Sequence, residues 1–244
     1  MAETIEITTP DGIAEAFLGQ GGPRGVLLFM DAIGLRPRIA DMVDEIAGWG
    51  YTVLAPNVFY REGRIADLAP TTDLRVPENR AAFFADSPVM EFVGRLTPER
   101  AARDTAAYVA TLQEYVAPAP LGTVGFCMGA RLAMRAAGQL PGVITAVAGF
   151  HGGGLVTDDH RSPHTAITPK AEYLFGHADH DRSMTPESAA ALDSAFEAAG
   201  ASYTSAIYPD APHGYTMADT SSWHEPSARR AFEELRALLE RQLG

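Results

Sequence analysis

The sequence has few of the features that mark secreted, membrane-spanning or nucleic-acid-binding proteins. It holds one cysteine among 244 residues, so it cannot form an internal disulfide. Its longest apolar stretches, such as Val143 to Phe150, fall far short of the roughly 20 residues that span a bilayer. The first residues, Met1 to Thr4, show neither the basic nor the apolar part of a secretion signal. Lys and Arg number 19 against 31 Asp and Glu, a net charge of −12 that disfavours nucleic acid. These absences predict a cytoplasmic protein that binds neither membranes nor nucleic acid.

What the sequence does contain is enough apolar material for one folded domain. Hydrophobic residues make up 46% of the chain and charged residues 20%, the balance of a globular protein. Apolar runs of strand length alternate with longer segments of helical period, which is the pattern of βαβ units. We therefore predict a single α/β domain over residues 1–244, with a mostly parallel sheet and helices on both faces. The expected strands are 4–9, 14–18, 25–30, 52–55, 122–126, 143–150, 171–175 and 203–208, of which the first two form a hairpin.

The helices are marked by their starts, and one segment breaks the alternation. Thr97 and Thr185 each precede a proline, which places a capping residue before Pro at the first helical position. An amphipathic pattern predicts a last helix over residues 226–243. Residues 61–96, in contrast, show no clean period. A segment of this length in a compact domain is either mobile or functional, and we predict a lid-like insertion over a site.

The only cysteine stands in a pattern typical of a catalytic nucleophile. Cys127 lies between Gly125 and Gly129, where an apolar strand runs directly into an Ala-rich helical segment. In such a turn the flanking glycines let strand and helix approach without a Cβ clash. The first N–H groups of the helix favour a thiolate and can bind an oxyanion. An ordinary cysteine has a pKa of about 8.5, so few of its thiols are ionised at neutral pH and a base is needed.

Two later loops offer a base and a carboxylate for this thiol. In sheets of the α/β-hydrolase type the order along the chain is nucleophile, acid, histidine, each on a loop after a later strand. The predicted strand 171–175 is followed by GHADHD, and the predicted strand 203–208 by PDAPHGY. We predict that His213 accepts the thiol proton and that Asp179 orients His213, with Asp181 as a close competitor.

Three segments together resemble the dienelactone hydrolase family: GFCMG at 125–129, GHADH at 176–180 and APHGY at 211–215. The segment VLLFMDAIG at 26–34 is also similar to the family's first core strand and the loop behind it, so the resemblance covers nearly the whole chain. It implies an α/β-hydrolase fold and a cofactor-independent cysteine hydrolase of a small ester or lactone, with a Cys-His-Asp triad and a thioester intermediate.

The resemblance also implies roles for residues around the nucleophile. Asp31 matches the family's acid that contacts the cysteine, although that acid is usually glutamate and Asp31 is one methylene shorter. The backbone N–H groups of Ala32 and Met128 match the two donors of the family's oxyanion hole.

The substrate-binding residues depart from the family. The family carries a carboxylate-binding arginine four residues after the histidine, and here that position is Met217. A flexible apolar side chain suits a hydrophobic group instead. We therefore expect a preference for neutral or weakly polar esters and lactones, unless Arg75 or Arg80 from the inserted segment replaces the missing arginine.

Other interpretations of the same residues remain open. A thiolate at a helix start also suits a thiol redox protein, although the chain has no resolving cysteine. The fold could also be catalytically silent and bind a ligand, or Cys127 could be a buried structural residue. The HGGG segment that begins at His151 follows the nucleophile rather than preceding it, so it predicts a flexible turn, with a place in the pocket wall as the alternative. The histidines and acids between 158 and 181 match no zinc pattern, and no nucleotide-binding glycine motif is present. We expect no metal or cofactor, a small-molecule substrate, and a monomer or homodimer.

Overall fold

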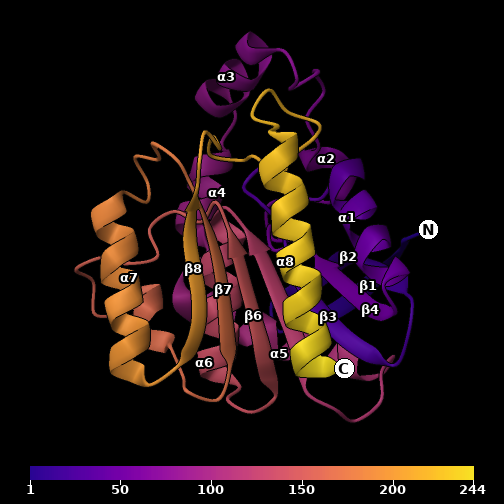
Figure 1. Ribbon diagram of the computed structural model, residues 1–244. Coiled ribbons are helices and arrows are strands. Elements are labelled where there is room, and N and C mark those ends of the chain that lie inside the picture. Colours follow the sequence, from indigo (N-terminus) through magenta and orange to yellow (C-terminus); the bar gives the residue numbers. More distant parts are fainter.

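The computed structural model describes residues 1–244, which build one eight-stranded sheet with the order β1-β2-β4-β3-β5-β6-β7-β8 (Figure 1). Strand β2 runs antiparallel to both of its neighbours, and all other neighbouring strands are parallel. The predicted α/β class and its opening hairpin are therefore confirmed. The strands are β1 (Glu3–Thr9), β2 (Gly12–Gln20), β3 (Arg24–Phe29), β4 (Tyr51–Pro56), β5 (Leu121–Phe126), β6 (Ile144–Phe150), β7 (Glu172–Ala178) and β8 (Ser202–Tyr208).

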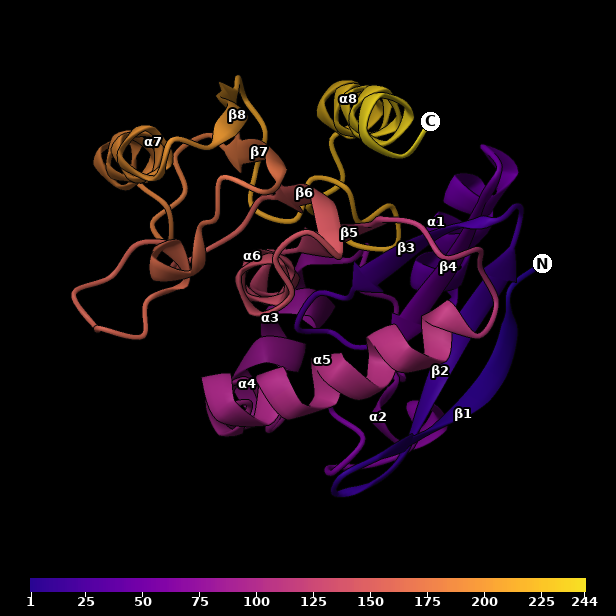
Figure 2. The ribbon, with the colours of Figure 1, turned by 90° about the horizontal axis from the view of Figure 1, so that it is seen from below.

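Helices cover both faces of the sheet, as Figure 2 shows in the view from below. Helices α1 and α8 pack on one face, and α5 and α6 pack on the other. Helix α7 packs against β8, and a short 3-10 turn, η1, contacts both α6 and α7. None of the helices combines the length and the apolar character needed to cross a membrane. Their bounds are α1 (Pro37–Gly48), α5 (Pro98–Gln113), α6 (Met128–Gln139), α7 (Pro186–Ala199) and α8 (Glu225–Leu243), with η1 at Pro163–Ala166.

The predicted helix starts form as expected. The hydroxyl of Thr97 accepts a hydrogen bond from the backbone N–H of Arg100, and that of Thr185 accepts one from Ser188, both at 3.3 Å. Each bond satisfies one of the free N–H groups at the start of a helix. The two threonines therefore fix where α5 and α7 begin.

The segment 61–96 differs from the sequence expectation of an irregular insertion. It forms three short helices, α2 (Ile65–Leu68), α3 (Pro77–Asp86) and α4 (Val89–Arg95). Neither α2 nor α3 has a fully buried residue, which explains the lack of a clear apolar period. Figure 1 shows α3 beyond the end of the sheet, on the side where the chain connects β8 to α8. Since loops at the carboxyl ends of parallel strands commonly form binding sites, this edge is the place to look for one.

Candidate active site

Cys127 occupies the sharp turn between β5 and α6. Its backbone has φ 54° and ψ −117°, a conformation that few non-glycine residues adopt. A Cβ at Gly125 would lie 2.0 Å from the carbonyl oxygen of Gly129, and a Cβ at Gly129 would lie 2.4 Å from that of Phe29. Both positions therefore require glycine for β5, α6 and β3 to pack this closely. The turn holds the thiol at the start of α6, as the Gly-x-Cys-x-Gly pattern predicts.

A continuous hydrogen-bonded chain joins the thiol to a buried carboxylate. The Nε2 atom of His213 lies 3.1 Å from Sγ of Cys127, and Nδ1 of the same ring lies 2.6 Å from Oδ2 of Asp181. The other oxygen of Asp181 accepts hydrogen bonds from the backbone N–H and the hydroxyl of Ser183, at 2.8 and 2.7 Å. Cys127 follows β5, Asp181 follows β7 and His213 follows β8, so three loops at one edge of the sheet supply the three groups.

The structure corrects the predicted acid, because Asp179 does not contact His213. The carboxylate of Asp179 accepts hydrogen bonds from the backbone N–H groups of His180 and Asp210 instead, at 3.0 and 3.1 Å. Strand β7 continues to Ala178, three residues beyond the predicted end at 175, so Asp179 is still tied to the strand edge. His180 then takes a φ of 53°, which turns the chain and directs Asp181 inward.

The hydrogen bonds and charges around His213 favour its protonated form. Burial alone lowers the pKa of His213, but the hydrogen bonds to Asp181 and Cys127 and the charge of the thiolate raise it to about 10. Burial raises the pKa of Asp181, yet the hydrogen bonds from His213 and Ser183 outweigh it and hold this pKa below its usual value. The imidazole of His213 is thus stabilised as a cation.

Two backbone N–H groups at the thiol are free to bind an oxyanion. Met128 is the first residue of α6, so its N–H group has no partner within the helix. The N–H of Ala32, in the loop after β3, donates to no backbone acceptor. Both residues line the same cavity as Cys127.

Asp31 lies in the site but does not bond to the cysteine, which corrects the predicted thiol contact. Its two carboxylate oxygens accept hydrogen bonds from Arg36, at 2.6 and 3.1 Å. Arg36 also binds Asp219 and is itself 3% exposed, so it joins the loop after β3 to the loop that follows His213. The two carboxylates raise the pKa of this buried guanidinium against the effect of burial. Asp31 is therefore held by a buried cation rather than directed at the thiol.

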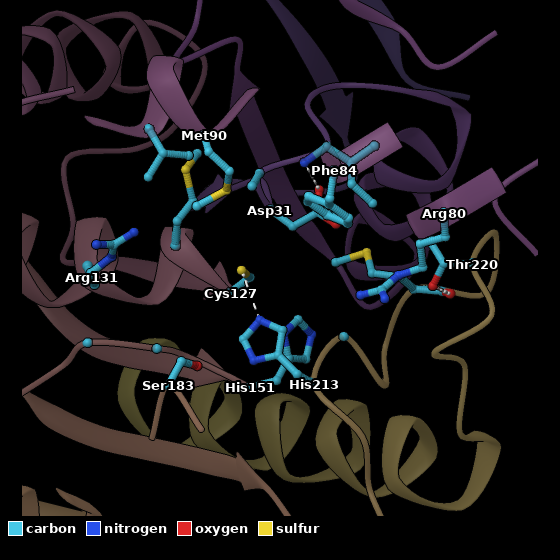
Figure 3. Close-up of a pocket in the computed structure, with 18 residues that line it drawn as sticks. Asp31, Arg80, Phe84, Met90, Cys127, Arg131, His151, Ser183, His213 and Thr220 are labelled. Atoms are coloured by element: carbon cyan, nitrogen blue, oxygen red, sulfur yellow. Dashed lines mark hydrogen bonds between the residues drawn. The ribbon is translucent and has the colours of Figure 1, made fainter. Parts of the chain in front are cut away.

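A cavity of about 440 Å³ opens over Cys127 and is lined by Arg80 and Met217, two of the three predicted substrate-binding residues. Figure 3 shows Arg80 and Arg131 on opposite sides of Cys127. The third predicted residue, Arg75, lies outside this cavity, because its exposed side chain pairs with Asp73 at 2.8 Å. The guanidinium of Arg80 forms no salt bridge, and its Nε atom is buried without a hydrogen-bond partner.

Two further residues line the cavity without a predicted role in the site, although a place in the pocket wall was one alternative for the segment that begins at His151. His151, expected in a flexible turn, is fully buried, and its Nε2 lies 2.7 Å from the hydroxyl of Thr216. Burial lowers the pKa of His151 far below its usual value, so its ring is neutral. Arg131 follows Cys127 by four residues on α6, and this helical spacing is a sequence signal that could have identified it. The histidines and acids between 158 and 181 gather into no group of three or more that could hold a metal ion.

The geometry can now be compared with known proteins. The model of the dienelactone hydrolase family matches residues 16–243. The chain belongs to this family. A relative from Methylorubrum extorquens, provisionally named a carboxymethylenebutenolidase, is 26% identical over 96% of this chain and 79% of its own length. The carboxymethylenebutenolidase of Pseudomonas sp. strain P51 is 24% identical over 88% and 84%.

A solved structure supports the same assignment at the level of the fold. It is a crystal structure from Klebsiella pneumoniae, provisionally named a dienelactone hydrolase, which covers 99% of this chain and 98% of its own with a TM-score of 0.81 and 19% identity. The predicted α/β-hydrolase fold is therefore confirmed. As a member of the dienelactone hydrolase family, the chain is a hydrolase.

Proposed function

We propose that this dienelactone hydrolase family member is a cysteine-dependent hydrolase of small esters or lactones that works through a thioester. The observation that carries the proposal is the hydrogen-bonded chain from Cys127 through His213 to Asp181. It gives the nucleophile a base, and it gives the base a carboxylate that fixes its tautomer.

Acylation begins with attack of the Cys127 thiolate on the substrate carbonyl carbon. The carbonyl oxygen becomes an oxyanion, which the N–H groups of Ala32 and Met128 stabilise. The tetrahedral intermediate then collapses: the bond to the leaving oxygen breaks, and the His213 imidazolium gives its Nε2 proton to that oxygen. For an ester, the products of this half-reaction are a free alcohol and a thioester on Cys127. For a lactone, the new hydroxyl group remains attached to the acyl group of the thioester.

Deacylation reverses these roles with water. Neutral His213 takes a proton from water, and the resulting hydroxide attacks the thioester carbonyl in the same oxyanion hole. Expulsion of the thiolate releases the carboxylic acid, so His213 is again an imidazolium beside a thiolate. Asp181 stabilises this cation in both half-reactions because its carboxylate remains hydrogen-bonded to Nδ1.

We further propose that segment 61–96 is a lid over the site of a single domain. Arg80 and Phe84 on α3 and Met90 and Val93 on α4 line the cavity, so these helices form one of its walls. Such a wall excludes water and selects the substrate, and Met217 adds an apolar contact on the opposite loop. Our proposal places this activity in the cytoplasm, on a small-molecule substrate.

The test uses the fact that the chain has one cysteine. Partial labelling with iodoacetamide, counted by mass spectrometry, is compared with turnover of p-nitrophenyl butyrate. Activity is expected to fall in proportion to labelling and to vanish at one label per chain. A fully labelled protein that keeps its activity contradicts the proposal. An unlabelled protein without esterase activity favours a thiol redox function or a silent binding fold instead.

A further inference from the structure

Two arginines of α6 have no carboxylate partner although they lie next to the proposed catalytic cavity. Arg131 and Arg135 are four residues apart and therefore project from the same side of the helix. Most arginines of the chain form salt bridges, whereas Arg135 donates only to the backbone carbonyl of Arg161. Two neighbouring cations without a carboxylate partner, beside a cavity of a chain with net charge −12, are candidates for binding an anionic ligand.

A groove of about 120 Å³ connects these two arginines to the catalytic cavity. Its walls come from α4, α5 and α6, and most of its lining is apolar, with Arg131 and Arg135 as the only charged groups. Val93, Met128 and Arg131 line both the groove and the cavity over Cys127. Arg131 thus stands at the junction, and Arg135 lies about 6 Å further along the helix axis, at 1.5 Å per residue.

The charges around the groove are unbalanced. Burial lowers the pKa of Arg131, and the Cys127 thiolate is the only group that opposes this effect. Burial also lowers the pKa of Arg135, and Arg131 and Arg161 lower it further, while Asp159 and Glu99 act in the opposite direction without contacting it. An anion bound in the groove would stabilise both guanidiniums.

The groove lies on the side of the nucleophile where the acyl part of a substrate belongs. His213 must protonate the leaving oxygen, so the leaving group faces His213. A Cβ built on the next residue, Gly214, would lie 3.9 Å from the Arg80 guanidinium, so the loop that carries His213 approaches Arg80. Figure 3 shows Arg131 on the opposite side of Cys127.

We propose that this groove is an anion subsite for the acyl chain: it binds a carboxylate at the distal end of the acyl group, with Arg131 reached by short chains and Arg135 by longer ones. The natural acyl group is then one half of a dicarboxylic acid. This inference rests on the proposed hydrolase function, and it replaces the expected preference for neutral substrates, which did not take Arg131 and Arg135 into account.

The experiment compares p-nitrophenyl half-esters of glutaric and suberic acids with the neutral p-nitrophenyl valerate and octanoate. The measured quantity is the ratio of kcat/KM for the acid to that for the neutral ester. Arg131→Gln is expected to reduce this ratio at least about tenfold for both acids, because a hydrogen-bonded ion pair is lost. Arg135→Gln should reduce it for suberate and leave glutarate nearly unchanged. Arg131→Lys keeps the charge and should lose less than Arg131→Gln, and Arg236→Gln on the far helix α8 serves as the control.

The outcomes separate the subsite from the hydrolase function. If the wild type cleaves the neutral esters and the ratios are the same in wild type, Arg131→Gln and Arg135→Gln, the subsite is wrong and the hydrolase function stands. If the wild type cleaves none of the esters, the hydrolase function is wrong. Calorimetric binding of glutarate then decides the subsite, and equal affinity of wild type and Arg131→Gln, or no binding to either, overturns it.

Discussion

The choice of acid in the proposed triad gives the sharpest single prediction, because two aspartates compete within three residues. Asp181 accepts from His213 through Oδ2, while its Oδ1 accepts from two donors of Ser183. In Asp181→Asn, the amide oxygen stays with Ser183 because both groups there are donors. The amide nitrogen must then face Nδ1 of His213 and donate to it. This forces the proton to Nε2, so the ring can no longer accept a proton from the thiol or from water.

The size of the effect follows from this change of tautomer. The same substitution in serine triads reduces turnover about 10,000-fold, through the wrong tautomer rather than lost geometry. A thiol ionises more readily than a serine hydroxyl, so we expect a smaller loss of kcat here, at least about a hundredfold. Asp179→Asn is the matched control. Its carboxylate accepts from the backbone N–H groups of His180 and Asp210 and contacts no atom of the proposed triad, so the variant should lose less than about fivefold.

The assay is steady-state hydrolysis of p-nitrophenyl butyrate by both variants, with circular dichroism to verify folding. A loss at Asp179→Asn equal to or greater than the loss at Asp181→Asn refutes the assignment. A fully active Asp181→Asn variant also refutes it, because the tautomer argument requires that substitution to disable His213.

Three more predictions test other parts of the site. The kcat/KM for an ethyl ester should fall as the pH rises through about 10, because the His213 imidazolium there loses the proton that the leaving alkoxide needs. In Asp181→Asn this decline should begin at lower pH, because the hydrogen bond to Asp181 that raises the pKa of His213 is gone. A pH profile that is the same in the variant and the wild type contradicts this prediction. Gly129→Ala should lower the melting temperature or prevent folding, because its Cβ would lie 2.4 Å from a β3 carbonyl oxygen, whereas Gly48→Ala, with nothing within 4 Å, should not; equal melting temperatures would count against the tight turn. Arg36→Met leaves a buried carboxylate unpaired and should reduce the free energy of unfolding in urea by about 3 to 5 kcal/mol, so a loss below about 1 kcal/mol would show that the ion pair contributes little.

The opening hairpin and the nucleophile turn could be predicted because local sequence determines them. Pro10-Asp11-Gly12 separates two short β-prone runs, which suffices for the opening hairpin. A Cβ at Gly125 would lie 2.0 Å from the carbonyl oxygen of Gly129, four residues further along, so the Gly-x-Cys-x-Gly spacing indicates the turn directly. These features depend on neighbours along the chain.

The parts that could not be predicted depend on contacts between distant segments. The choice between Asp179 and Asp181 depends on where β7 ends and on the left-handed turn at His180, and neither has a clear signal in the sequence. Arg36 reaches both Asp31 and Asp219, two carboxylates separated by most of the chain. The helices of segment 61–96 bury too little surface to show an apolar period. Their place over the cavity follows only from the folded chain.

The most direct test of the central claim is the esterase activity of Cys127→Ala, measured on folded protein with p-nitrophenyl butyrate. The proposed thioester mechanism predicts a loss in kcat of at least about a thousandfold, in line with nucleophile deletions in other hydrolases. The melting temperature should stay close to that of the wild type, because a half-buried thiol is replaced by a methyl group. A folded Cys127→Ala variant that keeps more than about a tenth of the wild-type kcat would contradict the claim that this cysteine carries the chemistry.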